Sequence, residues 1–200
     1  MSPTFIRLLV EGDLDEAVGR RLAVHCGLDV VAVYGRQGAG YVREKVSGFN
    51  RSAAGMPVVA IADSMDMAED CPPATIAALL PHPHPNMRFR LAVPEIESWL
   101  LADSANLSEF LGVPQARMPM SPDALQDPKA QLVSIARRSR RSSIVRLVVP
   151  LQGTGVSEGP GYTSEMQRFV DSLWDIPSSM AKSPSLSNCV HSLESLPRPR

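Results

Sequence analysis

The first hundred residues alternate between short apolar runs and stretches with helical periodicity, and this alternation constrains the fold more than any other feature. Strands separated by helices join into a parallel sheet through right-handed crossovers. The second apolar run is almost uninterrupted, as is typical of a strand covered on both faces. We therefore predict an α/β fold with a mostly parallel four-stranded sheet flanked by helices. The predicted strands are 4–10, 28–34, 57–62 and 88–93, and the predicted helices are 13–26, 41–54, 72–80 and 94–101.

The second hundred residues have mainly helical periodicity. We predict helices at 107–111, 129–141, 164–174 and 183–196, and a late edge strand at 144–149. This pattern predicts an α/β core over 1–112 and a helical extension over 113–196 that carries a basic segment and packs on the core. Residues 197–200 are predicted to form a frayed tail.

Acidic residues follow three of the four predicted strands. Glu11 comes directly after the first strand, Asp63 and Asp66 come after the third, and Glu95 and Glu97 come after the fourth. The carboxyl ends of parallel strands meet at one edge of a sheet, where ligands bind. Crowded carboxylates need protons or cations to neutralise them, and Mg²⁺ or Mn²⁺ prefers such oxygen ligands. Any one of these acids can instead cap a helix or interact with its dipole, but their joint appearance favours metal binding.

Three motifs carry a resemblance to a known family. They are Val10-Glu11-Gly12 after the first strand, the Asp63/Asp66 pair after an apolar strand, and Glu97-Ser-Trp-Leu-Leu101. Together they resemble the Toprim fold, and more closely the small DUF4276-type group of Toprim-like proteins, which is related to the overcoming-lysogenization-defect nucleases. The order and spacing of further matching stretches extend the resemblance over most of the chain. These stretches are 9–22, 35–40, 61–73, 93–112, 127–129, 137–141 and 183–186.

The resemblance implies a role for each acid. It implies that Glu11 serves in metal binding or general acid–base catalysis, and that Asp63 is the first aspartate of an Asp-x-Asp motif. Glu97 would be the glutamate of the last strand-to-helix junction, with Glu95 as an additional metal ligand. In the family pattern the second aspartate follows two residues after the first, whereas this chain has Asp63-Ser-Met-Asp66.

The longer spacing between the two aspartates affects the expected chemistry. In an extended segment side chains alternate with a period of two, so Asp66 would point away from Asp63 unless the chain bulges or has already turned. Either Asp66 reaches the metal from a loop, or Asp70 replaces it. A two-metal site, a one-metal site and an inactive site all remain open.

A basic segment lies in the second half. Residues 129–146 include six Lys or Arg and no Asp or Glu, although the formal net charge of the chain is only −1. Arginine suits bidentate contacts with phosphate, and such contacts give affinity that is independent of base sequence. The alternatives are a solvated helix face or partners for the acidic cluster. The predicted phosphate-binding residues are Lys129, Arg137, Arg138, Arg140 and Arg141.

A glycine-rich turn, Gly35-Arg-Gln-Gly38-Ala-Gly40, follows the second strand and precedes a helix. Exposed N–H groups at such a place can bind phosphate. The spacing matches neither the dinucleotide-binding glycine motif nor a Walker A sequence. We therefore predict a tight turn here, with phosphate binding as the alternative.

These features together favour a metal-dependent nuclease or a related phosphodiester-processing enzyme that uses Mg²⁺ or Mn²⁺. The resemblance also implies defence against phage or plasmids beside a separate ATPase subunit, since the chain lacks an ATP-binding motif. The alternatives are a non-catalytic Toprim-like module that binds a partner protein or a nucleotide, and an enzyme acting on a small phosphorylated molecule. The absence of a signal-peptide pattern and of a long apolar run predicts a cytoplasmic protein without membrane contact.

Overall fold

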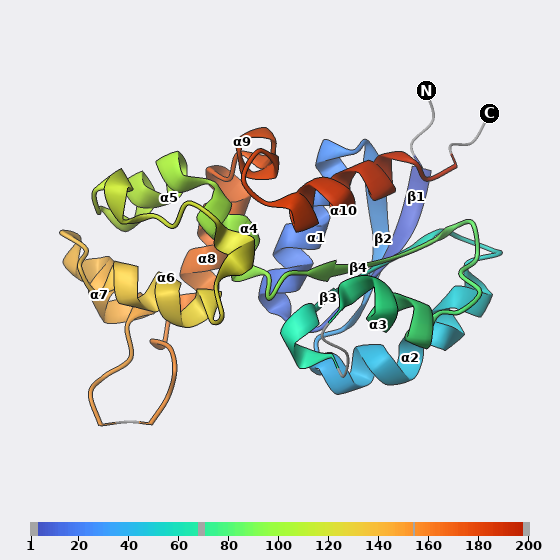
Figure 1. The fold of residues 1–200 in the computed structure, drawn as a ribbon, viewed down its shortest axis with the longest axis horizontal. Helices are drawn as coiled ribbons and strands as arrows, with labels where there is room; N and C mark the ends of the chain where they lie inside the picture. Colours follow the sequence, from blue (N-terminus) through green and yellow to red (C-terminus); the bar gives the residue numbers. More distant parts are fainter. Residues whose placement is uncertain (1–3, 68–70, 154, 198–200) are drawn as a thin grey trace. The chain divides into compact units, whose positions relative to one another are not determined.

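Four parallel strands form the sheet that the sequence alternation predicts. In the computed structural model they run in the order β2-β1-β3-β4, and each neighbouring pair is parallel (Figure 1). The α/β fold class is therefore confirmed. The bounds of the strands are Thr4–Val10 for β1, Leu28–Gly35 for β2, Val58–Asp63 for β3 and Met87–Ala92 for β4.

The structure describes residues 4–67, 71–153 and 155–197. The chain divides into two units, of which the first combines Met1–Ile96 with Ser185–Arg200 and the second is Glu97–Pro184. The expected boundary at residue 112 thus falls inside the second unit, and the last helix returns to the first. The reason is that residues after Ile96 pack among the later helices, while the last helix is bonded to β4.

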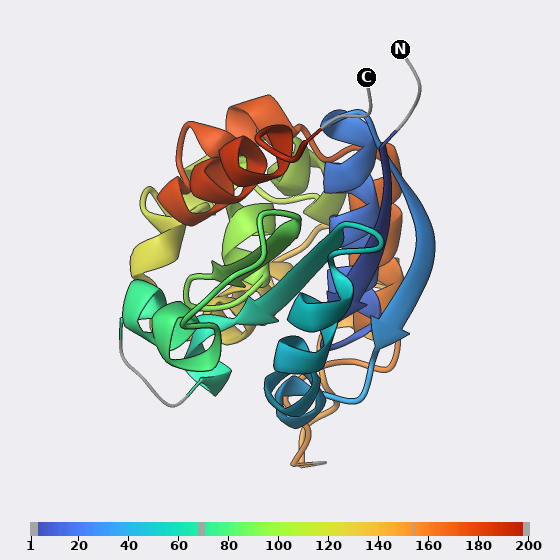
Figure 2. The ribbon, with the colours of Figure 1, turned by 90° about the vertical axis from the view of Figure 1, so that its right-hand side faces the viewer.

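Helices cover both faces of the sheet in the first unit. The alternation of side chains along β1 shows this, because Leu8 packs against α1 at Gly19 whereas Leu9 belongs to the cluster that includes Val42 and Val46 of α2. Figure 2 shows the twisted sheet between its helices. Because helices cover both faces of the sheet at β3, the strand is an uninterrupted run of hydrophobic residues up to Asp63. The helices of this unit are α1 (Asp13–His25), α2 (Ala39–Ser52), α3 (Pro72–Leu79) and α10 (Pro184–Glu194).

The glycine-rich turn after β2 is a tight turn that holds the backbone next to Glu11. Gly35 has φ +102°, and a Cβ atom there would lie 1.9 Å from the carbonyl oxygen of Val10, so no other residue fits. The Arg36 amide donates to Val10 O at 3.0 Å, and the Gly38 amide donates to Glu11 O at 2.9 Å. The turn therefore uses these amides to fix the end of β1.

Arg88 joins β4 to the end of α10. Its guanidinium donates to the carbonyl oxygens of Ser192 at 2.9 Å and Ser195 at 3.0 Å, and also to Pro85 O at 2.7 Å. The carbonyls at the end of a helix have no partner inside the helix, so a cation that binds them is stabilising. Arg88 thus attaches the last helix to the edge strand of the sheet.

We expect the substitution Arg88→Ala to lower the free energy of unfolding by about 2 kcal/mol, because hydrogen bonds to a charged donor contribute roughly 1.5–3 kcal/mol. Urea unfolding followed by circular dichroism measures this change. Arg90→Ala is the matched control, since Arg90 lies two residues further along the same strand and its Nε atom has no hydrogen-bond partner within the described chain. Equal losses in the two variants would contradict the assigned role of Arg88.

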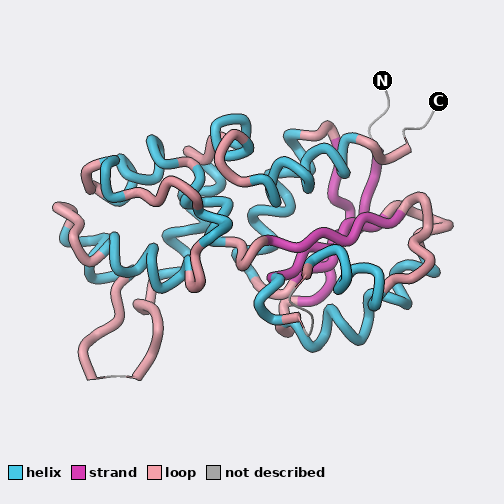
Figure 3. The backbone as a smooth tube through the Cα atoms, viewed as in Figure 1, coloured by secondary structure: helices cyan, strands magenta, loops and turns pink. Residues whose placement is uncertain are grey.

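The second unit is built from helices and turns, and every strand of the described chain belongs to the first unit (Figure 3). Its core contains the buried rings of Trp99, Trp174, Phe110 and Phe169. Trp174 Nε1 donates to Trp99 O at 3.3 Å and to Ser179 Oγ at 2.9 Å, so the indole is satisfied inside the core. The helices are α4 (Glu97–Ala102), α5 (Ser104–Leu111), α6 (Pro128–Ala136), α7 (Ser142–Val148), α8 (Tyr162–Ser172) and α9 (Ile176–Met180), with 3₁₀ turns at Gln115–Arg117 (η2) and Pro122–Ala124 (η3).

Two predicted elements in this unit are wrong. The expected basic helix 129–141 ends at Ala136, so its arginines lie on the turn between α6 and α7. Ser139 holds that turn, because its hydroxyl donates to Leu111 O and accepts a bond from the Arg141 amide at 2.9 Å. The expected edge strand 144–149 is instead helix α7, because a short apolar run does not distinguish a strand from a buried helix.

Among the described residues, no helix combines the length and apolar character needed to cross a membrane. The predicted tail lies outside the described residues except for its first residue, residue 197.

Candidate metal centre

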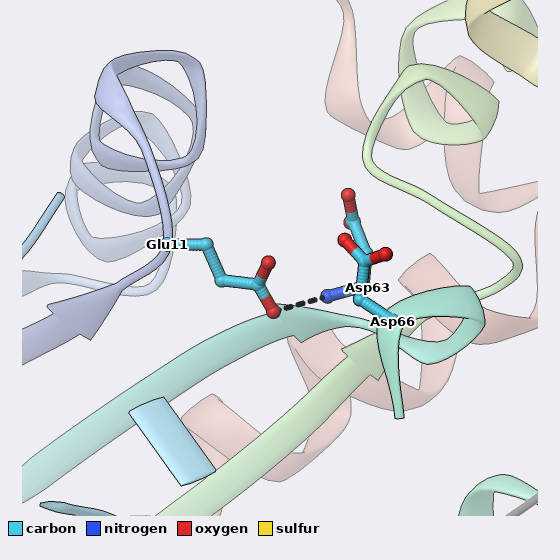
Figure 4. A group of neighbouring side chains, drawn as sticks. All are labelled: Glu11, Asp63 and Asp66. Atoms are coloured by element: carbon cyan, nitrogen blue, oxygen red, sulfur yellow. Dashed lines mark hydrogen bonds between the residues drawn. The ribbon is translucent and has the colours of Figure 1, made fainter. Parts of the chain in front are cut away.

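Three of the predicted acids meet at the carboxyl ends of β1 and β3. Glu11 follows β1, Asp63 is the last residue of β3, and Asp66 ends the 3₁₀ turn Ser64–Asp66 (η1) (Figure 4). Each offers one carboxylate oxygen, and these oxygens all lie within 4.8 Å of one another. The parallel sheet therefore brings together residues that are 52 positions apart in the sequence.

The 3₁₀ turn explains how Asp66 joins Asp63 despite the longer spacing. In a 3₁₀ helix three residues complete one turn, so side chains at positions i and i+3 lie on the same side. The turn is anchored by the Met65 amide, which donates to Pro94 O at 3.0 Å, and by the Ser64 hydroxyl, which donates to the same oxygen at 3.2 Å. The chain has thus already left the extended conformation before Asp66. Asp70 lies outside the described residues.

Hydrogen bonds hold Glu11 and Asp63 in place. Glu11 Oε1 accepts a bond from the Asp63 amide at 3.1 Å, and Asp63 Oδ1 accepts one from the Ile96 amide at 2.8 Å. Glu11 is buried with 8% of its surface exposed, Asp63 is half-buried and Asp66 is exposed. The cluster is therefore anchored at its buried end and accessible to solvent at Asp66.

Burial raises the pKa of Glu11 to about 7. The hydrogen bond from the Asp63 amide opposes this rise in pKa, while the negative charges of Asp15 and Asp66 add to it and the positive charge of Arg43 lowers it. The side chain therefore changes its charge near neutral pH. Burial beside other acids disfavours the carboxylate, and a bound cation would favour it.

The geometry and donor set of the three acids could hold a metal ion. Octahedral Mg²⁺ has bonds of roughly 2.0–2.1 Å, so neighbouring ligand oxygens are about 3 Å apart and opposite ones about 4 Å apart. Oxygens within 4.8 Å of one another need only small side-chain movements to reach these separations. Glu95 is buried and offers an oxygen within 4.8 Å of an Asp63 oxygen, which places it at the same strand ends.

Glu97 is the first residue of the second unit, where it is buried with 1% of its surface exposed. Its Oε1 accepts a hydrogen bond from the Tyr162 hydroxyl at 3.0 Å and lies 3.5 Å from Lys129 Nζ. Lys129 Nζ also lies 3.4 Å from Glu158 Oε2. Burial raises the pKa of Glu97, and Lys129 and the hydrogen bond from Tyr162 oppose that rise.

We expect Tyr162→Phe to lower the free energy of unfolding by about 1–3 kcal/mol, since the buried carboxyl of Glu97 loses a donor. The pKa of Glu97 should rise further. Chemical denaturation of the wild type and of Tyr162→Phe at neutral pH measures the change in the free energy of unfolding. Tyr34→Phe removes a hydroxyl from a side chain that is 39% exposed and should leave stability unchanged. A loss no larger than that of this control would show that the Tyr162–Glu97 bond contributes little.

The predicted phosphate-binding residues separate into two groups. Lys129 lies on α6 next to Glu97 and Glu158, so acids already neutralise its charge. The four arginines Arg137, Arg138, Arg140 and Arg141 are exposed on the turn between α6 and α7. Arg140 and Arg141 line an open cleft of about 450 Å³ together with Ser108, Glu109, Gly112, Val113 and Pro114.

Three residues near the acids were not predicted from the sequence. Arg43 influences the pKa of Glu11, and Tyr162 and Glu158 surround the Glu97–Lys129 pair. Tyr162 lies 65 positions from Glu97, and no motif links the two residues. Only the fold of each unit brings them to these acids.

Comparison of the chain with family models, with curated proteins and with solved structures gave no match.

Proposed function

We propose that this protein is a metal-dependent nuclease or a related phosphodiester-processing enzyme. The observation that carries the proposal is the cluster of Glu11, Asp63 and Asp66, whose carboxylate oxygens lie within 4.8 Å of one another at the ends of parallel strands. Such a donor set suits Mg²⁺ or Mn²⁺. The resemblance of the sequence to Toprim-like proteins supports the same reaction class.

The three acids have distinct roles in this proposal. Asp63 is held by the Ile96 amide and Asp66 by the 3₁₀ turn, so both present oxygens from a fixed backbone. A bound divalent ion would supply charge neutralisation at the phosphate and a more acidic water. The pKa of Glu11 is about 7 in the metal-free protein, and a bound cation would favour its carboxylate form, which could contact the ion or accept a proton from water. Participation of Glu95 and Glu97 as further ligands stays a prediction.

The partners follow from the sequence. The exposed arginines between α6 and α7 support a nucleic-acid substrate. A separate ATPase subunit, a cytoplasmic location and a role in defence against phage or plasmids are implied by the family resemblance and are part of the proposal.

A cleavage assay tests the enzymatic proposal. Purified protein is incubated with plasmid, single-stranded DNA and RNA in Mg²⁺, Mn²⁺ or EDTA, and the variants Glu11→Gln and Asp63→Asn are compared with Asp29→Asn, which changes an exposed acid of β2. We expect cleavage with Mg²⁺ or Mn²⁺ that falls at least about 100-fold in the first two variants, since general acid–base catalysis contributes roughly 10²–10⁴-fold. Cleavage that persists in EDTA or in both variants would overturn the proposal.

A second function is favoured by the environment of Glu97. Within the second unit, Lys129 neutralises the charge of this glutamate and the Tyr162 hydroxyl donates a hydrogen bond to it. Fewer carboxylates are therefore available to bind a metal. A module that binds metal and a nucleotide or protein without cleaving a phosphodiester fits that arrangement. Metal binding without cleavage of any substrate, in the presence of an ATPase partner, would favour this function. Turnover of a small phosphorylated molecule would instead support the third alternative.

A further inference from the structure

A hollow of about 310 Å³ lies on the surface of the second unit, between the 3₁₀ turn Gln115–Arg117 and helix α6. Its volume is at the lower end of the range for ligand pockets, roughly 300–1,000 Å³. The residues that line it come from positions about twenty apart in the sequence, so only the folded unit forms it. They are Ala116, Arg117, Gln131, Ser134, Ile135 and Arg138.

The polar groups of this hollow are donors without acids beside them. Arg117 and Arg138 contribute two guanidinium groups, Gln131 contributes an amide and Ser134 contributes a hydroxyl, and the lining contains no Asp or Glu. Within the described part of the chain, neither guanidinium group has an ion pair or a hydrogen bond. Arg168 differs in this respect, because Glu165 neutralises it.

The arrangement favours an anion with several oxygens. Two positive groups line one hollow, and both attract an anion that binds there. Arginine binds phosphate oxygens through paired N–H groups, and amide and hydroxyl groups add single hydrogen bonds. The hollow therefore matches the chemistry of a phosphate group better than that of an apolar ligand.

We infer that this hollow binds a phosphodiester group of a nucleic-acid strand, an inference that rests on the proposed function for its choice of ligand. Arg138 belongs to the same turn as Arg140 and Arg141, which line the larger cleft. A strand that follows this turn contacts both hollows through its backbone. Arg117 thereby joins the nucleic-acid-binding surface, although the sequence places it outside the basic segment.

Binding measured without metal tests this inference separately from catalysis. The anisotropy of a fluorescein-labelled single-stranded oligonucleotide is followed in EDTA with the full chain, over a range of salt concentrations. We expect Arg117→Ala and Arg138→Ala each to weaken binding by about tenfold, the effect of losing one charged hydrogen-bonding contact. The slope of log K against log salt should also decrease in magnitude by about 0.7 for each lost phosphate contact.

Arg146→Ala is the matched control, because Arg146 is an exposed arginine of the same unit that does not line the hollow. It should change the affinity less than twofold, and thermal unfolding should show that all three variants are folded. Unchanged binding in Arg117→Ala, or an equal loss in Arg146→Ala, would overturn the inference. Tight binding of inorganic phosphate without binding of the strand would assign the hollow to a small phosphorylated molecule and would also overturn it. If the protein binds the oligonucleotide as expected but cleaves no substrate, the proposed function fails and the inference about the hollow still holds.

Discussion

Replacing Glu11 with glutamine is expected to raise the free energy of unfolding of the metal-free protein by about 3 kcal/mol at pH 8. The pKa of this carboxyl rises from 4.5 to about 7 on folding, and each pKa unit corresponds to roughly 1.36 kcal/mol. Glutamine keeps an oxygen that accepts the bond from the Asp63 amide but carries no charge to desolvate. The substitution therefore removes an unfavourable charge while it preserves the local geometry.

The sign of the pH dependence follows from proton binding. Between pH 4.5 and about 7 the unfolded chain loses the Glu11 proton whereas the folded protein keeps it, so the contribution of Glu11 to stability decreases as pH rises through this window. Above pH 7 both states are ionised and the contribution levels off. Urea unfolding of the wild type and of Glu11→Gln at several pH values in EDTA should show the difference growing across the window.

Glu44→Gln is the control for this prediction, because the Glu44 side chain is 69% exposed on α2. It should give equal stability to the wild type within about 0.5 kcal/mol at every pH, as expected for a surface substitution. If the Glu11→Gln protein is no more stable than the wild type at pH 8, then burial of the ionised Glu11 carboxylate does not lower the free energy of unfolding, which contradicts the prediction.

Manganese is expected to stabilise the wild-type protein strongly, and Asp63→Asn should abolish that effect. A ligand at 100 times its dissociation constant stabilises the state that binds it by about 2.7 kcal/mol. Asp63 lies between Glu11 and Ile96 in the hydrogen-bond network and is the last residue of β3, so its charge is central to the cluster. Asparagine keeps the shape of the side chain and removes its negative charge.

Thermal unfolding with increasing Mn²⁺ concentration provides the measurement. Asp29→Asn, which changes an exposed acid of β2, should retain the full shift. Because Glu11 takes up a proton below pH 7, the apparent affinity for Mn²⁺ should fall as the pH decreases from 8 to 6. An equal shift in Asp63→Asn and in the wild type would place the ion elsewhere on the protein.

The sheet was predictable because its apolar runs are joined by helices, although β2 is not covered on both faces as its run predicts, since only Leu28 is buried and Val31 is 51% exposed. Strand β3 illustrates this, since its first five residues are buried and its β-branched run directly follows Pro57. Helix α7 was not predictable from the same kind of run. Its neighbours are other helices, and a segment of seven residues contains too little periodicity to separate helix from strand. The return of α10 to the first unit depends on bonds from Arg88, which no local pattern contains.

The candidate site was predictable in its position and not in its detail. Parallel topology alone brings Glu11 and Asp63 to one edge, and an Asp66 oxygen lies within 4.8 Å of theirs. The reason it does so lies in a 3₁₀ turn anchored to Pro94, which is 30 positions away from Ser64. The alternative that the basic segment supplies partners for the acids holds for Lys129, whose Nζ lies 3.5 Å from Glu97 Oε1, but no local pattern indicates which acid it meets.

The most direct test of the metal centre is the anomalous scattering of a crystal of the protein soaked in Mn²⁺. The metal-centre assignment predicts one peak in contact with carboxylate oxygens of Glu11, Asp63 and Asp66, at roughly 2.0–2.3 Å, and the loss of that peak in crystals of Asp63→Asn. Full occupancy at another position, with these three side chains free of the ion, would contradict it.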